Sequence, residues 1–178
     1  LVSFEGRYPN LSALAGKVMS FDYRLLAGLD RSDWDSVARF VATAVNDSVI
    51  DAAMQAMPDE YAPKIPELRA KLKSRRDLLP AAALRYYGVL SQVMDLHGSD
   101  SADVATIRSL DNGELEVSIR SGNAEPYFER RFVPGETREV RVYLHGGNDS
   151  THVSGPATPA IIVRVIGGNG TNVVVDPS

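Results

Sequence analysis

Apolar residues recur at intervals of three and four along residues 30–57, which predicts two amphipathic helices separated at Asn46. Asp30 or Ser32 can cap the first helix and Asn46 the second, because their side chains accept hydrogen bonds from the N–H groups of a first helical turn. Pro58 ends the second helix. The apolar faces comprise Trp34, Val37, Ala38, Val41 and Val45 in the first helix, and Val49, Ile50, Ala53, Met54 and Met57 in the second.

Prolines divide the segment that follows. Pro66 suits the first turn of a strongly basic helix, and we expect Pro80 to restart the chain as a further helix. That last amphipathic helix is predicted to end near His97–Gly98. At the other end of the chain, Leu1–Tyr8 are predicted to form a short strand. The apolar positions of the last helix are Ala83, Tyr87, Leu90 and Met94.

The pattern changes to alternation after a polar linker at residues 98–104. Leu115, Val117 and Ile119 alternate with polar residues, as in a half-buried strand. Asp111-Asn112-Gly113 just before them is a strong hairpin signal, because Asn-Gly accepts positive φ at both central positions. The pattern predicts further strands at residues 104–110, 127–132 and 137–144.

The C-terminal part contains an internal repeat of strand, glycine turn and strand. Its two Gly-Gly-Asn turns begin at Gly146 and Gly167, and superposing the turns aligns Val140 with Ile161. The repeat predicts two solenoid-like strand/Gly-Gly-turn units. The copies are Val140–His145, Gly146–Asp149 and His152–Ser154, followed by Ile161–Ile166, Gly167–Gly170 and Val173–Val175.

These patterns together predict an α+β fold in three parts. An N-terminal extension spans residues 1–20, a small helical bundle spans 21–98, and a β-rich domain of five to seven short strands spans 99–178. Stacked repeats leave the edges of their sheets exposed, and such edges need to be covered or paired. No capping pattern follows Val175. We therefore expect a partner chain or downstream sequence to cover that end.

Composition narrows the class of protein. The chain of 178 residues is 44% hydrophobic and 24% charged, which is typical of a globular protein. Its net charge of −4 argues against broad nucleic-acid binding, which needs a positive field. The lack of cysteine excludes disulfides, thiolate metal sites and a cysteine nucleophile. No apolar run approaches the roughly 20 residues that span a bilayer. A chain that begins at Leu1 without a signal-peptide pattern is expected to be processed or part of a longer protein.

Residues 167–175 are similar to the nonapeptide of calcium-binding β-rolls, Gly-Gly-x-Gly-x-Asp-x-apolar-x. In that family the aspartate and backbone carbonyls hold calcium between stacked turns. Asn172 replaces the aspartate here, which removes a charge that calcium favours, and Asp149 takes the place of the third glycine in the upstream copy. We therefore interpret both turns as metal-free structural turns and predict no cofactor, with calcium as the alternative.

Two groups of residues have the side chains of a reactive site. His145, Asp149 and His152 are close enough in sequence to hold a transition metal, although loop histidines are more often solvated. His97 and Ser99 stand next to Asp100, but a working catalytic triad is assembled across a fold and not along one segment. We predict neither a metal site nor a catalytic residue, and hence no enzyme.

Two further observations fit a chain without an active site. Asp30, Asp33 and Asp35 lie at a helix start, where negative charge stabilises the helix dipole. No glycine-rich phosphate loop or dinucleotide fingerprint is present in the sequence. We therefore expect no small-molecule substrate.

Two neighbouring blocks of opposite charge provide the strongest candidate for a binding site. Residues 30–60 are predominantly acidic and residues 64–76 predominantly basic, so the two helical segments can simply attract each other as solvated faces. The basic helix can instead face an acidic protein or anionic lipid headgroups. On the second interpretation the partner-binding residues are Lys64, Arg69, Lys71, Lys73, Arg75 and Arg76.

Residues 132–149 and 162–168 carry a resemblance to a family, and residues 25–35 and 49–53 match it more loosely. They resemble the connecting segment of large bacterial envelope proteins, between an upstream phosphoesterase- or kinase-like region and a downstream surface-antigen (D15-type) outer-membrane β-barrel. Asn169 and Asn172 depart from that pattern, which has glycine or aspartate there. The resemblance implies an envelope location and a non-catalytic module.

The sequence therefore predicts a non-catalytic scaffolding subunit or interaction module on the extracytoplasmic, periplasmic side of a larger, membrane-associated bacterial assembly. Its partners would be proteins, with possible contact to a membrane surface and without nucleic acid. One alternative is a non-catalytic part of a larger envelope enzyme, phosphoesterase- or kinase-like, whose active site lies outside this chain. Another is a calcium-stabilised binding module.

Overall fold

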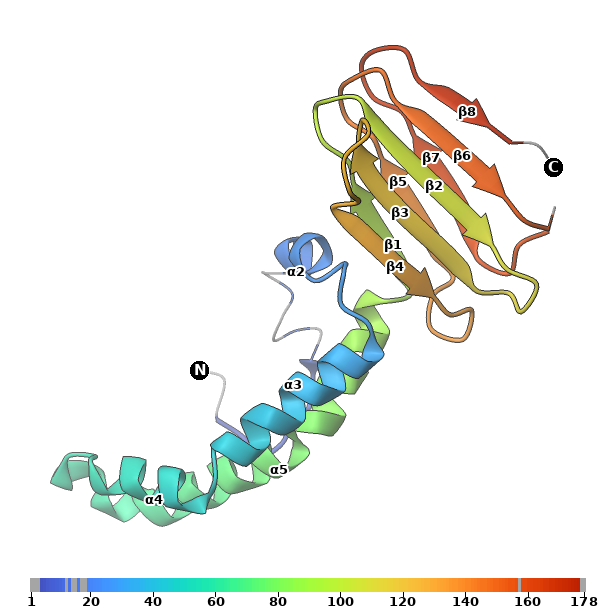
Figure 1. Cartoon of the computed structure of the whole chain (residues 1–178). Coiled ribbons are helices and arrows are strands. Elements are labelled where there is room, and N and C mark those ends of the chain that lie inside the picture. Colours follow the sequence, from blue (N-terminus) through green and yellow to red (C-terminus); the bar gives the residue numbers. More distant parts are fainter. Residues whose placement is uncertain (1–3, 12, 14–15, 17–18, 157, 177–178) are drawn as a thin grey trace. The chain divides into compact units, whose positions relative to one another are not determined.

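The computed structural model describes residues 4–11, 13, 16, 19–156 and 158–176. Helices form the N-terminal part and strands the rest, arranged as two sheets, so the predicted α+β class is confirmed (Figure 1). The chain divides into two compact units. The helical unit comprises Leu1–Lys17 and Asp30–Tyr87, and the strand unit comprises Val18–Leu29 and Gly88–Ser178. The strand predicted at Leu1–Tyr8 lies partly outside the described residues, and residues 4–8 form no strand.

Local capping determines where the first helices of the helical unit begin. The Asp30 carboxylate accepts a hydrogen bond from the backbone N–H of Asp33 at 3.0 Å, and Asp33 accepts one from Asp30 N–H at 3.0 Å. Asn46 accepts a hydrogen bond from Val49 N–H at 3.1 Å. Both predicted caps are therefore confirmed. The helices of this unit are α3 (Arg31–Ala44), α4 (Asp47–Gln55), the 3-10 helix η1 (Asp59–Lys64) and α5 (Ile65–Leu90).

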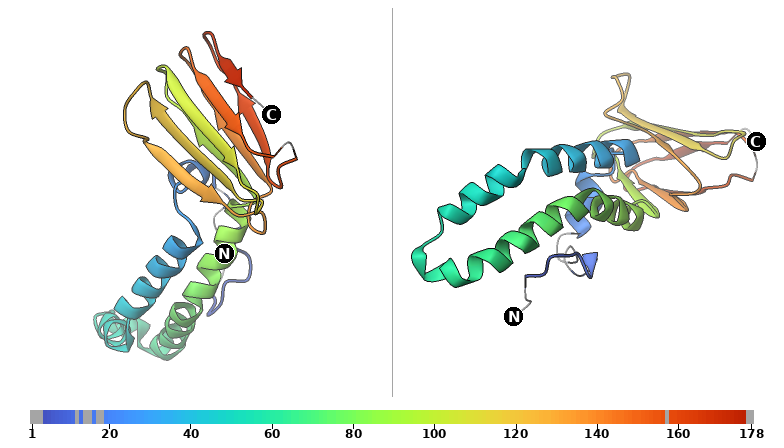
Figure 2. Two further views of the ribbon diagram at one scale, coloured as in Figure 1. Left: turned by 45° about the vertical axis from the view of Figure 1, so that its right-hand side comes forward. Right: turned by 90° about the horizontal axis from the view of Figure 1, so that it is seen from below.

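The basic segment and the segment after Pro80 form one helix, α5, so the predicted break at Pro80 is wrong. A proline removes one backbone hydrogen bond, and packing along the rest of a long helix can outweigh that loss. Trp34 of α3 provides such packing, because its ring lies 5.9 Å from that of Tyr86 and 6.2 Å from that of Tyr87. Figures 1 and 2 show α3 running alongside α5. The predicted apolar face of α3 is only partly buried, since Val37 is 60% exposed.

The strand unit contains two facing sheets with the core between them (Figure 2). The three-stranded sheet has the order β1-β5-β7, and the five-stranded sheet has the order β4-β3-β2-β6-β8. Helix α2 (Met19–Leu25) contacts β1. Eight strands are described, more than the five to seven predicted. They are β1 (Val93–His97), β2 (Asp103–Ser109), β3 (Leu115–Ser121), β4 (Phe128–Phe132), β5 (Glu139–Tyr143), β6 (Ser150–Ser154), β7 (Ile162–Ile166) and β8 (Val173–Val175).

Three segments pass from the first sheet to the second through a corner, and we call each strand–corner–strand segment a tier. Tier 1 is β1–β2, tier 2 is β5–β6 and tier 3 is β7–β8. All three run parallel in both sheets. The hairpin β3–β4 is inserted between tiers 1 and 2, and it extends the second sheet by antiparallel pairing on β2. The predicted turn at residues 111–113 connects β2 to β3, with Gly113 at φ 85°.

The strand β1 corrects the predicted last helix, which was expected to continue to His97–Gly98. Helix α5 ends at Leu90, and the burial of Val93–His97 then alternates, with Met94 and Leu96 in the core. These residues pair in parallel with β5, which lies far along the chain beyond the hairpin β3–β4. The short apolar spacing suits a helix or a strand, and this distant pairing selects the strand.

The register between tiers 2 and 3 corrects the predicted repeat. The structure pairs Val140 with Val163, and not with Ile161 as the superposed turns suggested. The number of residues from Val140 to its partner Val163 is called the tier period below. Hydrogen bonds at the corner select it, because Asn169 N–H donates to the His145 carbonyl at 2.7 Å. A shift of two positions keeps every side chain on the same face of its sheet, so the hydrophobic pattern alone does not distinguish the two registers.

Candidate functional site

The corners of the tiers nest against one another with almost no space between their backbones. A Cβ atom on Gly147 would lie 2.6 Å from the carbonyl of Ser101, in the corner of tier 1. One on Gly170 would lie 2.0 Å from the oxygen of Gly147, and both glycines have positive φ, +124° and +109°. Glycine is therefore required twice at the same place in successive corners, by close approach and by backbone conformation.

A row of Asp and Asn side chains connects the corners. Asp149 is 2% exposed, and its Oδ1 accepts a hydrogen bond from the backbone N–H of Asp103 at 2.9 Å. One tier further, Asn172 Oδ1 accepts from Asp149 N–H at 3.3 Å. Asp103 also holds its own corner, because its carboxylate accepts bonds from the N–H and hydroxyl of Ser99. Each tier thus satisfies a backbone donor of the tier before it, which fixes the stacking register.

Tyr127, which precedes β4, interacts with Asp103 of this row. Its phenol is partly desolvated and hydrogen-bonded to the carboxylate of Asp103, and together these raise the pKa of Tyr127 far above its ordinary value of 10.0. Burial is the larger cause and the negative charge of Asp103 the second. The phenol of Tyr127 therefore stays protonated at neutral pH.

The outer edge of tier 3 is uncovered among the described residues. Val174 pairs with the fully buried Thr151 of β6 and so faces the same side of the sheet, yet Val174 is 56% exposed. Ile162, at the start of β7, is 47% exposed. Alternate residues of a strand direct their backbone groups to opposite edges. The backbone N–H groups of Ile162 and Val173 donate to carbonyls of the tier 2 segment. The backbone N–H and C=O groups of Val163, Val165 and Val174 are therefore directed to the open edge.

A charge network lies on the outward face of the first sheet. Glu139 Oε1 accepts hydrogen bonds from Arg141 Nε at 2.7 Å and from Arg164 Nε at 2.8 Å. The bond from Arg141 is the main cause of a lowered Glu139 pKa, and Arg164 contributes in the same direction. The charge of Arg164 on β7 is thus directed back to tier 2.

Two histidines that are far apart in sequence meet at the corner of tier 2. His97 Nδ1 lies 2.9 Å from His145 Nε2, and the two rings are stacked with centroids 5.1 Å apart. Burial is the first cause of a lowered His97 pKa, and the neighbouring His145 is the second. One ring must donate and the other accept in this contact, so it is weakened when both are protonated.

Apart from the contact between His97 and His145, the residues considered for metal binding or catalysis bind other partners or face solvent. His145 contacts His97, Asp149 is buried against Asp103, and His152 is exposed on β6. Ser99 bonds to the carboxylate of Asp103 instead of forming a triad with His97 and Asp100. Within the described part of the chain no group of three or more His, Asp or Glu side chains is placed to hold a metal ion. Asn172, at the aspartate position of the calcium motif, uses its oxygen for Asp149 N–H.

Most of the predicted basic residues pair with groups of the helical unit itself. Arg69 contacts Asp51 at 3.0 Å, and Lys73 contacts Asp47 at 3.0 Å. Hydrogen bonds from Arg76, and then from Lys73, lower the pKa of Asp47. Arg75 stacks on the rings of Phe4 and Tyr8, at 4.9 Å and 4.3 Å, and Lys71 pairs with Glu67 at 2.6 Å. The two charge blocks therefore attract each other across α4 and α5, while binding of a partner by this face stays a prediction.

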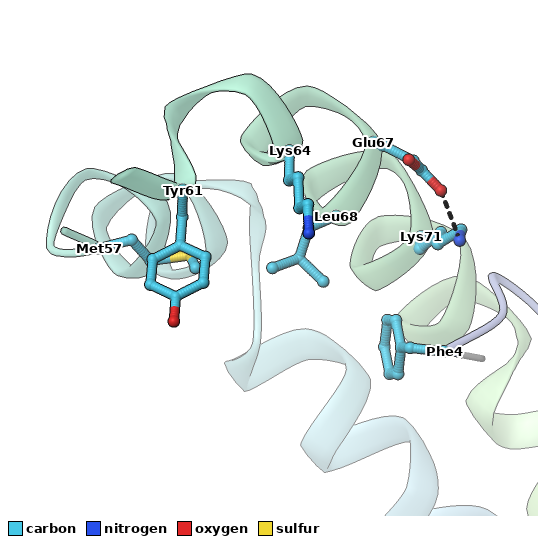
Figure 3. Close-up of a pocket in the computed structure, with 7 residues that line it drawn as sticks. All are labelled: Phe4, Met57, Tyr61, Lys64, Glu67, Leu68 and Lys71. Carbon is cyan, nitrogen blue, oxygen red and sulfur yellow. Dashed lines mark ion pairs between the residues drawn. The ribbon is translucent and has the colours of Figure 1, made fainter. Parts of the chain in front are cut away.

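A shallow groove of about 460 Å³ lies on the helical unit (Figure 3). Its apolar lining is Phe4, Met57, Tyr61 and Leu68. Lys64, another of the predicted partner-binding residues, also lines the groove. Lys71 and Glu67 form an ion pair at its rim. The groove thus combines an apolar lining with charged side chains.

The tier period would have revealed most of the features that the sequence interpretation missed. Asn172 follows Asp149 by one tier period, and Asp149 follows Asp103 by two, so a search at this period finds the row directly. The shorter spacing between the two Gly-Gly-Asn turns hides it. The contact of His97 with His145 does not follow the tier period and requires the folded corner as well.

No protein-family model, curated protein or solved structure matches this chain. Among the described residues, none of the helices is long and apolar enough to cross a membrane.

Proposed function

We propose that this chain is a non-catalytic scaffolding or interaction module, and that it binds a protein partner at the open edge of tier 3. The tiers act in this proposal as a short solenoid whose last layer is available for pairing. The observation that carries it is the exposure of Val174, whose neighbour Thr151 in the previous tier is fully buried. A layer that covered Val174 would complete the core and pair the backbone groups of β7 and β8.

We further propose that the partner belongs to a membrane-associated assembly on the extracytoplasmic side of a bacterial cell. The resemblance of residues 132–149 to the connecting segment of envelope proteins supports this location, and the lack of cysteine is compatible with it. The module would then hold parts of an assembly together by strand pairing, and any chemistry would belong to its partners.

Photo-crosslinking in the native host tests the proposed function. A crosslinking residue at Val175 lies on the open edge. The control position is Thr106, which pairs with His152 as His152 pairs with Val175, but its strand β2 lies between β3 and β6. We expect Val175 to crosslink to an envelope protein and Thr106 to give no such product. Equal crosslinking from both positions, or none from Val175, would contradict the proposed binding edge.

A further inference from the structure

The register of the tiers is constant throughout the strand unit. Tiers 2 and 3 are offset by one tier period in both sheets, since the first residues of β5 and β7 pair with each other, as do those of β6 and β8. Tiers 1 and 2 are offset by two tier periods in both sheets, because the hairpin β3–β4 lies between them. The bridge from Gly146 to Asn169 keeps one tier period at the corner. Every corner therefore has the same length, and successive tiers stack as repeats of one geometry.

From this regularity we propose that the open edge accepts a fourth tier supplied by the partner: a parallel strand–corner–strand segment with Asp or Asn at the end of its corner. This inference rests on the proposed function and specifies the chemistry of the partner. Asp149 caps the N–H of Asp103, and Asn172 caps the N–H of Asp149. In the described part of the chain Asn172 N–H has no acceptor, and it is the next donor in the row.

The glycine contacts add a second requirement. Gly147 approaches Ser101, and Gly170 approaches Gly147 at the equivalent position one tier later. The residue that stacks on Gly170 would meet its carbonyl in the same way. We therefore expect the partner segment to carry glycine there, two positions before its Asp or Asn, as Gly147 precedes Asp149 and Gly170 precedes Asn172.

A second copy of the chain is a poorer occupant. The tier 1 end contacts α2 at β1, and the hairpin β3–β4 continues the second sheet beyond β2. Arg130 of β4 donates a hydrogen bond to the Ala27 carbonyl at 2.6 Å, which ties the segment after α2 to this end. Two copies joined at their tier 3 edges by a twofold axis would run antiparallel. Their corners would then lie at opposite ends, and neither the Asp/Asn row nor the glycine contacts would continue.

The chain supplies its own probe for this partner chemistry. A labelled synthetic peptide of residues 139–154 contains a complete tier, with Gly147 and Asp149 at the required positions. Glu139 in the peptide would lie beside β7, where Arg164 is its partner in the folded chain. The control peptide carries the single substitution Gly147→Ala, which leaves both strands unchanged. Fluorescence anisotropy with the full chain measures the affinity of each peptide.

We expect the tier peptide to bind the full chain, and the Gly147→Ala peptide to bind about tenfold more weakly or worse, because alanine resists positive φ. Val174→Lys in the protein should abolish binding, and Val174→Thr should retain it, provided that both variants keep the circular dichroism of the parent. Equal affinity of the two peptides would overturn the requirement for glycine in the partner's corner. Strand pairing at the edge, and with it the proposed function, would remain. Failure of the tier peptide to bind, or formation of a homodimer that blocks it, would also overturn the fourth tier. Crosslinking at Val175 tests the proposed function separately.

Discussion

Neighbouring glycines in the corner of tier 2 should respond very differently to the same added methyl group. Gly147 has φ +124°, and its Cβ would lie 2.6 Å from the Ser101 carbonyl, which is backbone and cannot rotate away. Gly146 has no positive φ, and its Cβ would lie 3.4 Å from the Asp100 carboxylate, an ordinary contact with a mobile side chain. Gly147→Ala and Gly146→Ala therefore form a matched pair within one corner.

The expected difference can be estimated from these contacts. Positive φ costs an alanine roughly 1–2 kcal/mol, and forcing the two corners apart costs about 1–3 kcal/mol more. Gly147→Ala should thus lower the unfolding free energy of the strand unit by roughly 2–5 kcal/mol. Gly146→Ala should change it by less than about 1 kcal/mol, because an unstrained alanine mainly reduces the entropy of the unfolded chain.

Chemical denaturation of the full chain provides the assay. Circular dichroism follows the strands, while the single tryptophan, Trp34, reports on the helical unit by fluorescence. The midpoint of the strand signal should fall clearly for Gly147→Ala and stay close to the parent value for Gly146→Ala. Similar losses for both variants, or no loss for Gly147→Ala, would refute the nested-corner geometry.

Three other predictions concern the strand unit and the charge blocks. Asp149→Leu should lower the unfolding free energy by about 1–3 kcal/mol, because it leaves the buried N–H of Asp103 without an acceptor. Asp149→Asn keeps that acceptor and should cost less; equal losses of stability in chemical denaturation would argue against the Asp/Asn row. Because the His97 pKa is lowered in the folded chain, its contribution to stability is fully present above pH 6.5 and is lost as the pH falls through the folded pKa. His97→Asn should flatten this pH dependence of stability, and a variant with the parent's pH profile would contradict the prediction. Asp47→Asn should destabilise the helical unit at low salt and much less at high salt, because the exposed Asp47 carboxylate pairs with Lys73 and Arg76 and salt screens such pairs; a loss that ignores salt would exclude ion pairing as the cause.

Features determined by neighbouring residues could be predicted from the sequence. The caps at Asp30 and Asn46 and the turn at residues 111–113 depend on side chains within a few positions, and the structure confirms them. The second strands of the repeat, β6 and β8, also follow from local composition. Helix caps and tight turns could therefore be predicted from residues that are close in sequence.

Features determined by distant contacts could not be predicted. The segment Val93–His97 fits a helix by spacing, and its pairing with β5 decides for a strand. The tier period depends on corner hydrogen bonds, such as that from Asn169 to His145, that the hydrophobic pattern does not encode. The opposite charges of the two helical blocks were visible, but their mutual pairing depends on how α4 lies against α5.

Hydrogen exchange of the outward backbone amides of tier 3 tests the central claim most directly. Val163, Val165 and Val174 should exchange rapidly in the isolated chain, and Val173 should be slower, because its N–H already bonds to Asp149 at 2.9 Å. In the native assembly the three outward amides should become protected together. If they exchange equally fast in the assembly and in the isolated chain, the edge of tier 3 is not where this protein binds.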